Sequence, residues 1–257
     1  MRTTASRFPL TPGHWSMALL AVLTPCLVAF HTPPSMTFFN QVMAVIGWGL
    51  WLASLGLQPA AWRGADTDAL AWRGLMGLAV VLGGYGLMSL GAVWWGPLPV
   101  GLGLMHAGLC AAAWIVCVAG WQLRRQALWD VAVDLFLWGL VVAGLIGWLI
   151  ALLQAFHPSW TDGHLIAEAT MPGRAVGNLR QPNHFSTQMV WSAAAAAALG
   201  IRRRLPAHVA SVLLAVFIWA VVLSASRTGM IGMVFFCLWG LLHRGAPRAV
   251  RLGLILA

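Results

Sequence analysis

The feature that most constrains the fold of this chain is a succession of long apolar runs that carry almost no charge. Clear examples extend over 74–93, 100–121 and 208–224. These runs are continuous and lack the alternation of apolar and polar residues, over segments of about ten, that marks the strands of an outer-membrane barrel. A helix needs roughly 20 apolar residues to cross a bilayer, and within lipid it satisfies its own backbone hydrogen bonds. The runs therefore predict transmembrane helices.

The composition excludes a soluble protein of this size. Of the 257 residues, 60% are hydrophobic and 8% are charged, whereas a soluble domain carries about 25% charged residues. We therefore predict an all-α, polytopic bundle of transmembrane helices that forms a single domain over 1–257. We expect about eight complete spans, at 15–30, 38–57, 74–93, 100–121, 132–155, 185–200, 208–224 and 229–243. A ninth apolar run, from Leu252 to Ala257, is too short to cross a bilayer, so we interpret the chain as the N-terminal portion of a longer pattern.

The distribution of arginine predicts the orientation of these spans. The net charge of +9 is carried by arginine without any lysine. In a soluble protein this charge would suggest nucleic acid, but in a membrane protein basic residues mark the cytoplasmic side. With the N-terminus in the cytoplasm, the outer connections contain Arg174, Arg180 and Arg227, and the inner segments contain Arg2, Arg7, Arg63, Arg73, Arg124, Arg125, Arg202, Arg203, Arg204, Arg244, Arg248 and Arg251. We therefore predict a cytoplasmic N-terminus and no nucleic-acid partner.

The longest connection, at about 156–184, lies on the predicted outer side and ends in the string GNLRQPNHF at 177–185. Pro182 suits the first turn of a helix, where its missing N–H costs nothing. The positive end of that helix favours an anion, and Arg180 adds a guanidinium suited to phosphate oxygens. The other polar residues at the helix mouth are Gln181, Asn183 and His184. The string predicts an anion site, although a helix cap at a wet interface explains the same residues.

A second string, SASRTG at 224–229, joins two predicted spans through a very short turn. Arg227 must therefore lie near membrane depth, where an ionisable residue suggests a functional role. Snorkelling of its side chain into the lipid headgroups is the alternative. In the long loop, Asp162 and Glu168 have the chemistry of general bases, but we interpret them as solvated loop residues.

Taken together, GNLRQPNHFSTQ at 177–188 and SASRTG at 224–229 resemble the O-antigen ligase and O-antigen polymerase superfamily. The first string is most similar to the branch of bacterial O-oligosaccharyltransferases that glycosylate pilins and other periplasmic proteins. The segment His31-Thr32-Pro33-Pro34, followed by Phe38-Phe39-Asn40-Gln41, also resembles the first outer loop of that branch. The resemblance covers the N-terminal part of the family pattern, through the eight expected spans.

The resemblance implies transfer of a preassembled glycan from an undecaprenyl diphosphate carrier to an acceptor hydroxyl. The reaction would take place at the periplasmic face of the bacterial inner membrane, in contact with membrane lipid. The acceptor would be a pilin-like protein, the lipid A core in lipopolysaccharide biosynthesis, or a growing polymer. Arg180 and Arg227 would hold the carrier diphosphate with Gln181 and Asn183 beside them, and His184 and Arg174 are further candidates for the same site. The resemblance implies no metal and no cofactor.

One departure from the family pattern affects the catalytic role. Family members carry a large periplasmic loop, after further spans, with a histidine that acts on the acceptor hydroxyl, and this sequence contains no such loop. We therefore assign no catalytic residue and expect these 257 residues alone not to catalyse transfer. One alternative is a transporter or flippase, which would place ionisable residues at the membrane midplane. Asp130 and Asp134 instead lie at a predicted cytoplasmic end. The other alternative is a non-catalytic, truncated membrane protein.

Overall fold

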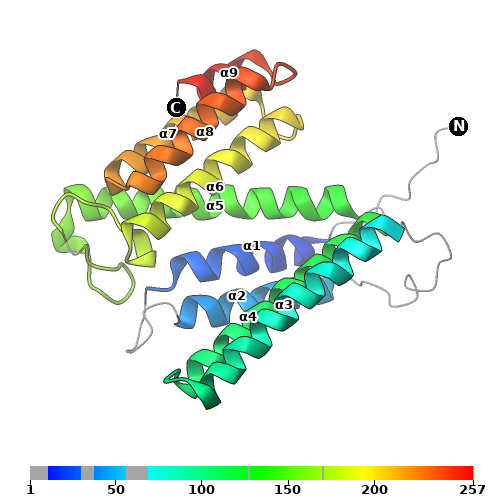
Figure 1. Ribbon diagram of the computed structural model, residues 1–257. Helices are drawn as coiled ribbons and strands as arrows, with labels where there is room; N and C mark the ends of the chain where they lie inside the picture. The colour runs from blue at the N-terminus through cyan, green and yellow to red at the C-terminus, as the bar shows by residue number, and fades with distance from the viewer. Residues whose placement is uncertain (1–10, 30–37, 56–68, 127, 170, 257) are drawn as a thin grey trace, which may run out of the picture. The chain divides into compact units, whose positions relative to one another are not determined.

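The computed structural model describes residues 11–29, 38–55, 69–126, 128–169 and 171–256. Within these ranges every regular element is helical, as predicted (Figure 1). The α-helices are α1 (Pro12–Leu27), α2 (Phe38–Ser54), α3 (Ala69–Trp95), α4 (Val100–Arg125), α5 (Trp129–Phe156), α6 (Pro182–Ile201), α7 (Ala207–Ser224), α8 (Arg227–Leu242) and α9 (Arg248–Ile255), and two short 3-10 helices are η2 (Pro158–Trp160) and η3 (Gly177–Leu179).

Each of the eight predicted runs corresponds to one of the helices α1 to α8. Four of the described helices, α3, α4, α5 and α7, are long and apolar enough to cross a membrane. The number of spans and the side of the N-terminus stay predictions. The ninth apolar run lies within α9, which begins earlier than predicted, at Arg248. Several residues used above lie outside the described ranges: the segment 31–34, Arg2, Arg7, Arg63 and Ala257.

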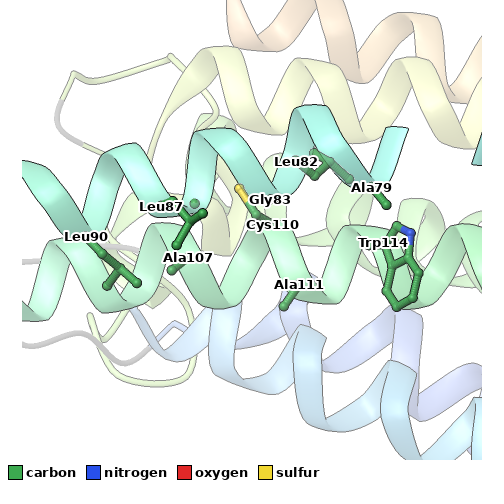
Figure 2. A pocket seen from close by; sticks show the side chains of 10 residues that line it. Ala79, Leu82, Gly83, Leu87, Leu90, Ala107, Cys110, Ala111 and Trp114 are labelled. Atoms are coloured by element: carbon green, nitrogen blue, oxygen red, sulfur yellow. The ribbon is translucent and has the colours of Figure 1, made fainter. Parts of the chain in front are cut away.

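The chain divides into two compact units, and the first contains residues 55–132. Here α3 and α4 form a hairpin in which small residues allow close helix packing. A Cβ added to Gly103 would lie 2.5 Å from Val93 Cγ2. Farther along the hairpin, an apolar cavity of about 410 Å³ is lined by both helices, including Gly83, Cys110 and Trp114 (Figure 2).

The second unit contains residues 9–54 and 133–257, and α6 lies at its centre. The alanine run of α6 is almost fully buried, with Ala195 at 1% and Ala197 at 0% exposed. Gly144 of α5 lies against Ser192 of α6, and an added Cβ would come 2.5 Å from the serine Cβ. The Ser192 hydroxyl donates to the Leu140 carbonyl at 2.8 Å. Small side chains and interhelical hydrogen bonds therefore hold α6 in place, by the kind of packing that is common between membrane helices.

Candidate functional site

The start of α6 is set by a sharp change in backbone direction. After η3, Arg180 adopts a left-handed conformation with φ of 58°, Gln181 is extended, and Pro182 occupies the first position of α6. Such a φ is uncommon for a residue with a side chain and marks a place where the surroundings hold the backbone. Gly177 also has a positive φ, and an added Cβ would lie 2.5 Å from a ring carbon of Phe185. The glycine therefore allows the loop to close over the first turn of α6.

A buried amide at the end of α5 anchors the long loop. Gln154 is 0% exposed. Its Oε1 accepts hydrogen bonds from the N–H groups of Val176 and Gly177, both at 2.9 Å, and its Nε2 donates to the Ala167 carbonyl at 2.6 Å. Sequence reasoning missed this residue. The sequence signal that could have indicated its role is an uncharged polar side chain near the end of an apolar run.

A second buried amide, Asn178, fastens the loop to α1. Its Oδ1 accepts from the Ala167 N–H at 3.0 Å, and its Nδ2 donates to the carbonyls of Leu27 and Leu165 at 2.7 and 2.8 Å. All of its polar atoms are therefore engaged in holding the loop. This residue, which lies inside the first string, has a structural role.

The second string forms a tight turn between α7 and α8. Ala225 has a φ of 47°, and Ser226 is the N-cap of α8, with its hydroxyl accepting from the Gly229 N–H at 3.3 Å. Because Gly229 has no side chain, α8 begins directly against α6; an added Cβ would lie 2.9 Å from Ser186 Cβ. Since Ser226 is the N-cap residue, Arg227 occupies the first position of α8.

The two strings meet in the folded chain, although they are far apart in the sequence. Asn183 Oδ1 accepts a hydrogen bond from the Ser226 hydroxyl at 2.8 Å. Ser186 Oγ lies 2.9 Å from Ser226 Oγ and also 2.9 Å from the Asn183 carbonyl oxygen. The N-termini of α6 and α8 are therefore joined side by side, with Gln181, Asn183, His184 and Arg227 exposed around them.

The arginines at this junction differ in what they contact. Arg180 is partly buried, and its Nη2 has no hydrogen-bond partner among the described residues. Its burial lowers the pKa of the guanidinium from the usual value, although arginine stays cationic in proteins. The side chain of Arg227 is exposed and forms no ion pair or hydrogen bond within the part of the chain that is described. Neither cation is therefore neutralised by a carboxylate within the described part of the chain.

Arg174 is engaged by the protein itself. Its Nε donates to the Ser224 carbonyl at 2.9 Å, and Nη2 lies 3.4 Å from the Ala225 carbonyl oxygen. A cation at the C-terminal end of α7 satisfies carbonyls that have no helical partner and complements the helix dipole. Arg174 therefore supports the turn that presents Arg227.

Asp162, one of the two acidic residues of the loop, is bonded to backbone N–H groups, unlike a carboxylate that is free to act as a general base. Asp162 Oδ1 accepts hydrogen bonds from the N–H groups of His164, Leu165 and Ile166, at 2.8–3.0 Å. These bonds, led by that from Ile166, lower the pKa of the carboxyl. The Asp162 carboxylate therefore closes a turn of the loop.

Among the described residues, no group of three or more His, Cys, Asp or Glu side chains is arranged to hold a metal ion.

An apolar cavity of about 380 Å³ lies next to the junction, within the second unit. It is lined by α1, α2, α5 and α6, and its wall includes Pro25, Trp48 and Leu140. Leu179 and His184, which lie on either side of the backbone turn at Arg180–Pro182, also line it. The wall of this apolar cavity therefore includes residues on both sides of Arg180 in the sequence.

Comparison with protein families gives one finding on this part of the chain. Residues 175–199 match the family of protein glycosylation ligases. The matched stretch contains the corner of Arg180 and nearly all of α6, and it supports the glycosylation branch of the resemblance noted above. Comparison with curated proteins and with solved structures gives no significant match.

Proposed function

We propose that this protein takes part in glycan transfer by binding the diphosphate of an undecaprenyl-diphosphate-linked glycan at the junction of α6 and α8. The observation that carries the proposal is the pair of joined helix N-termini, flanked by Arg180 and Arg227. The match to protein glycosylation ligases at 175–199 supports glycan transfer as the activity.

The electrostatics of the junction favour a polyvalent anion. Each helix N-terminus carries about half a positive charge and presents N–H groups without helical partners. In α6 the Phe185 N–H is already bonded to the Gln181 carbonyl at 3.0 Å, which leaves the N–H groups of Asn183 and His184 at the mouth. Two guanidinium groups add full charges. A diphosphate, which gains negative charge as the glycosidic bond breaks, is stabilised by such preorganised donors.

The adjoining cavity supports a lipid-linked ligand. Its lining is mostly apolar, and it includes Leu179 and His184, which lie on either side of Arg180 in the sequence. A ligand with an anionic head and a hydrocarbon tail would place the head at the arginines and the first part of the tail in the cavity, because burial of apolar surface is favourable. The acceptor in this proposal is a pilin-like protein or the lipid A core, approaching from the periplasmic side.

The test is substitution of the two arginines. Arg180→Ala and Arg227→Ala are each expected to weaken binding of undecaprenyl diphosphate. In an intact transferase that carries the later catalytic loop of the family pattern, each is expected to reduce glycan transfer roughly 10–1000-fold, the scale for loss of one charge-stabilising donor. Lysine should restore it poorly, since it lacks the planar fork that binds two phosphate oxygens. Transfer is measured as glycosylated acceptor in membranes supplied with lipid-linked glycan, and affinity for undecaprenyl diphosphate is measured in the same variants.

The matched control is Arg204→Ala, which removes an arginine at the other end of α6. It should leave carrier affinity unchanged. Full transfer and unchanged affinity in both alanine variants at the junction would rule out the diphosphate site. Variants that no longer accumulate in the membrane would instead point to a structural role for the arginines.

A further inference from the structure

We propose that Ser226 is a positioning residue of the diphosphate site. Its hydroxyl orients the Asn183 side chain so that the amide NH₂ group faces the ligand, and it holds the N-terminus of α8 beside that of α6. This inference rests on the proposed function. Neither string reveals it alone, because the serine lies in one string and the asparagine in the other.

The hydrogen bonds of Ser226 define the orientation. A serine hydroxyl has one proton to donate and two lone pairs that accept. Ser226 donates its proton to Asn183 Oδ1 at 2.8 Å and accepts from the Gly229 N–H at 3.3 Å, while Ser186 Oγ completes the set at 2.9 Å. Ser226 is 1% and Ser186 0% exposed. Bulk water therefore has little access to replace a bond that is lost there.

With Oδ1 directed at Ser226, the Asn183 amide presents its two N–H donors away from that contact. No acceptor for them is found among the described residues, and Asn183 is exposed at the second position of α6. The donors therefore lie at the same helix mouth as the backbone N–H groups of Asn183 and His184. Neutral donors of this kind complement the two guanidinium groups around phosphate oxygens.

The same hydroxyl also fixes Arg227. Ser226 is the N-cap residue of α8, and Arg227 follows it directly. A single side chain thus sets the start of one helix and the side-chain orientation at the start of the other. Removing the hydroxyl should loosen both the Asn183 amide and the Arg227 guanidinium, whereas a substitution that keeps the hydroxyl should preserve the positions of these two groups.

The experiment measures the affinity of the full chain, in detergent, for two probes: undecaprenyl diphosphate and the neutral alcohol undecaprenol. Ser226→Ala is expected to weaken binding of the diphosphate about tenfold, the scale for one hydrogen bond to a charged ligand, and to leave binding of the alcohol unchanged. Ser226→Thr should restore the diphosphate affinity because it keeps the hydroxyl. Asn183→Asp should weaken diphosphate binding at least as much, since it keeps an acceptor for Ser226 but replaces the outward donors with an anion.

The control is Ser211→Ala, which removes a serine that donates to the Ala207 carbonyl within α7, at 2.9 Å. It should leave both affinities unchanged. If Ser226→Ala lowers the thermal midpoint of the protein strongly, Ser186→Ala provides the second variant, because it leaves the N-cap of α8 intact. Ser186→Ala is then expected to reduce diphosphate affinity and not alcohol affinity.

Two outcomes would overturn the inference while leaving the proposed function in place. In the first, Ser226→Ala and Ser186→Ala bind the diphosphate as tightly as the parent protein, although Arg180→Ala and Arg227→Ala do not. In the second, Ser226→Ala weakens both probes equally, which is the mark of a purely structural residue. If none of the four variants changes diphosphate affinity, the proposed function itself fails.

Discussion

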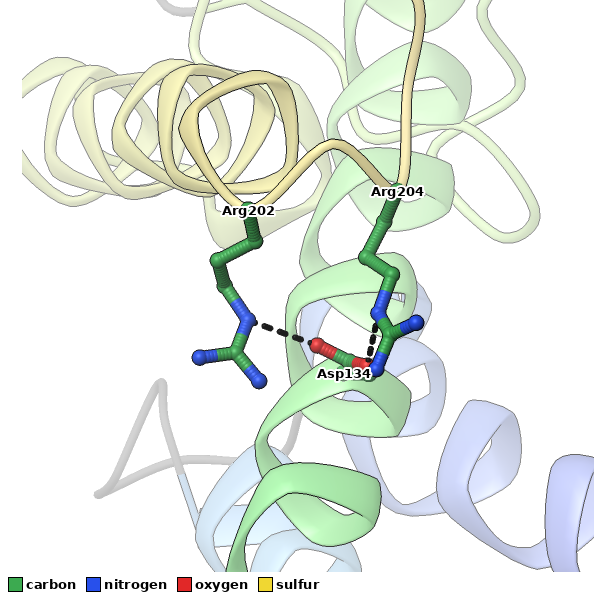
Figure 3. Close-up of polar contacts among 3 residues, drawn as sticks. All are labelled: Asp134, Arg202 and Arg204. Carbon is green, nitrogen blue, oxygen red and sulfur yellow. Dashed lines mark hydrogen bonds and ion pairs between the residues drawn. The ribbon is translucent and has the colours of Figure 1, made fainter.

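The two ends of α6 both carry arginines, but the protein treats them in opposite ways. Beyond the C-terminal end, Arg202 and Arg204 converge on one carboxylate, with Nε atoms 2.8 and 2.6 Å from the oxygens of Asp134 in α5 (Figure 3). At the N-terminal end, Arg180 and Arg227 have no carboxylate partner within the described part of the chain. The same residue type is neutralised at one end and left available at the other.

The helix dipole makes this contrast informative. A cation is stabilised near a helix C-terminus and opposed near a helix N-terminus, by about 0.3–1 kcal/mol at exposed positions. Arg202, the C-cap residue of α6, is therefore favourably placed before its ion pair is considered. Arg227 lies at the first position of α8, and Arg180 lies just before α6, where the dipoles oppose them. The helix dipoles therefore disfavour these two positions, and a bound anion would offset that cost.

The first prediction concerns the side of the membrane on which each end lies. In a background without the four native cysteines, a cysteine introduced within 156–184 should react with a membrane-impermeant maleimide added outside. A cysteine at 202–204 should react only after permeabilisation, because the arginine distribution places it in the cytoplasm. Labelling of both positions from the same side would contradict the orientation, and with it the placement of the diphosphate site on the outer face.

The second prediction reverses one charge at each end. Arg180→Glu should weaken binding of undecaprenyl diphosphate by more than about 100-fold, since a preorganised donor is replaced by a repelling anion. Arg204→Glu should leave the affinity within about twofold, because its partner is Asp134 and not the ligand. The measurement is a dissociation constant for each variant in detergent. If both variants lost affinity to a similar extent, the proposed difference between Arg180, which binds the ligand, and Arg204, which serves the fold, would be wrong.

The third prediction compares stability instead of binding. Asp134→Ala leaves two arginines without their carboxylate, and we expect it to lower the free energy of unfolding by about 1–2 kcal/mol, a value reduced for the partial exposure of the arginines. Arg227→Ala should leave the stability unchanged or raise it slightly, because it removes a cation from a helix N-terminus. Denaturation in mixed micelles measures both. A large loss of stability in Arg227→Ala would show that this arginine serves the fold.

The helices were predictable from the sequence because lipid imposes one simple requirement. Each predicted apolar run corresponds to one of the helices, since a spanning segment must satisfy its backbone hydrogen bonds locally. The start of α6 at Pro182 also follows from local chemistry. The division of the described chain into two compact units did not follow from the apolar pattern, because hydropathy does not specify which helices pack together.

The connections within the candidate site were less accessible to sequence reasoning. Both arginine-containing strings were recognised, but their contact through Asn183 and Ser226 depends on how α6 and α8 pack, and no local pattern encodes that. Gln154 and Asn178 bond to loop backbone that is distant in sequence. Arg174, a further candidate for the diphosphate site, donates from its guanidinium to the carbonyls at the end of α7, a contact that no local sequence pattern indicates. Side-chain roles that depend on long-range backbone contacts need the fold.

The last and smallest predicted effect concerns the loop that leads to Arg180. Asp162 has a lowered pKa because its carboxylate accepts backbone hydrogen bonds, first that from Ile166. A lowered folded-state pKa contributes stability that is fully present above the unfolded value, about 3.9 for aspartate, and is lost as the pH falls through the folded value. Amide protection at His164, Leu165 and Ile166, corrected for intrinsic exchange, should therefore hold from pH 7 to about 5 and decline below about 4. Asp162→Ala should abolish this protection at every pH, while protection in the middle of α6 should not change. Protection of the three amides that persists to pH 2 would show that other contacts, and not the Asp162 carboxylate, close this turn.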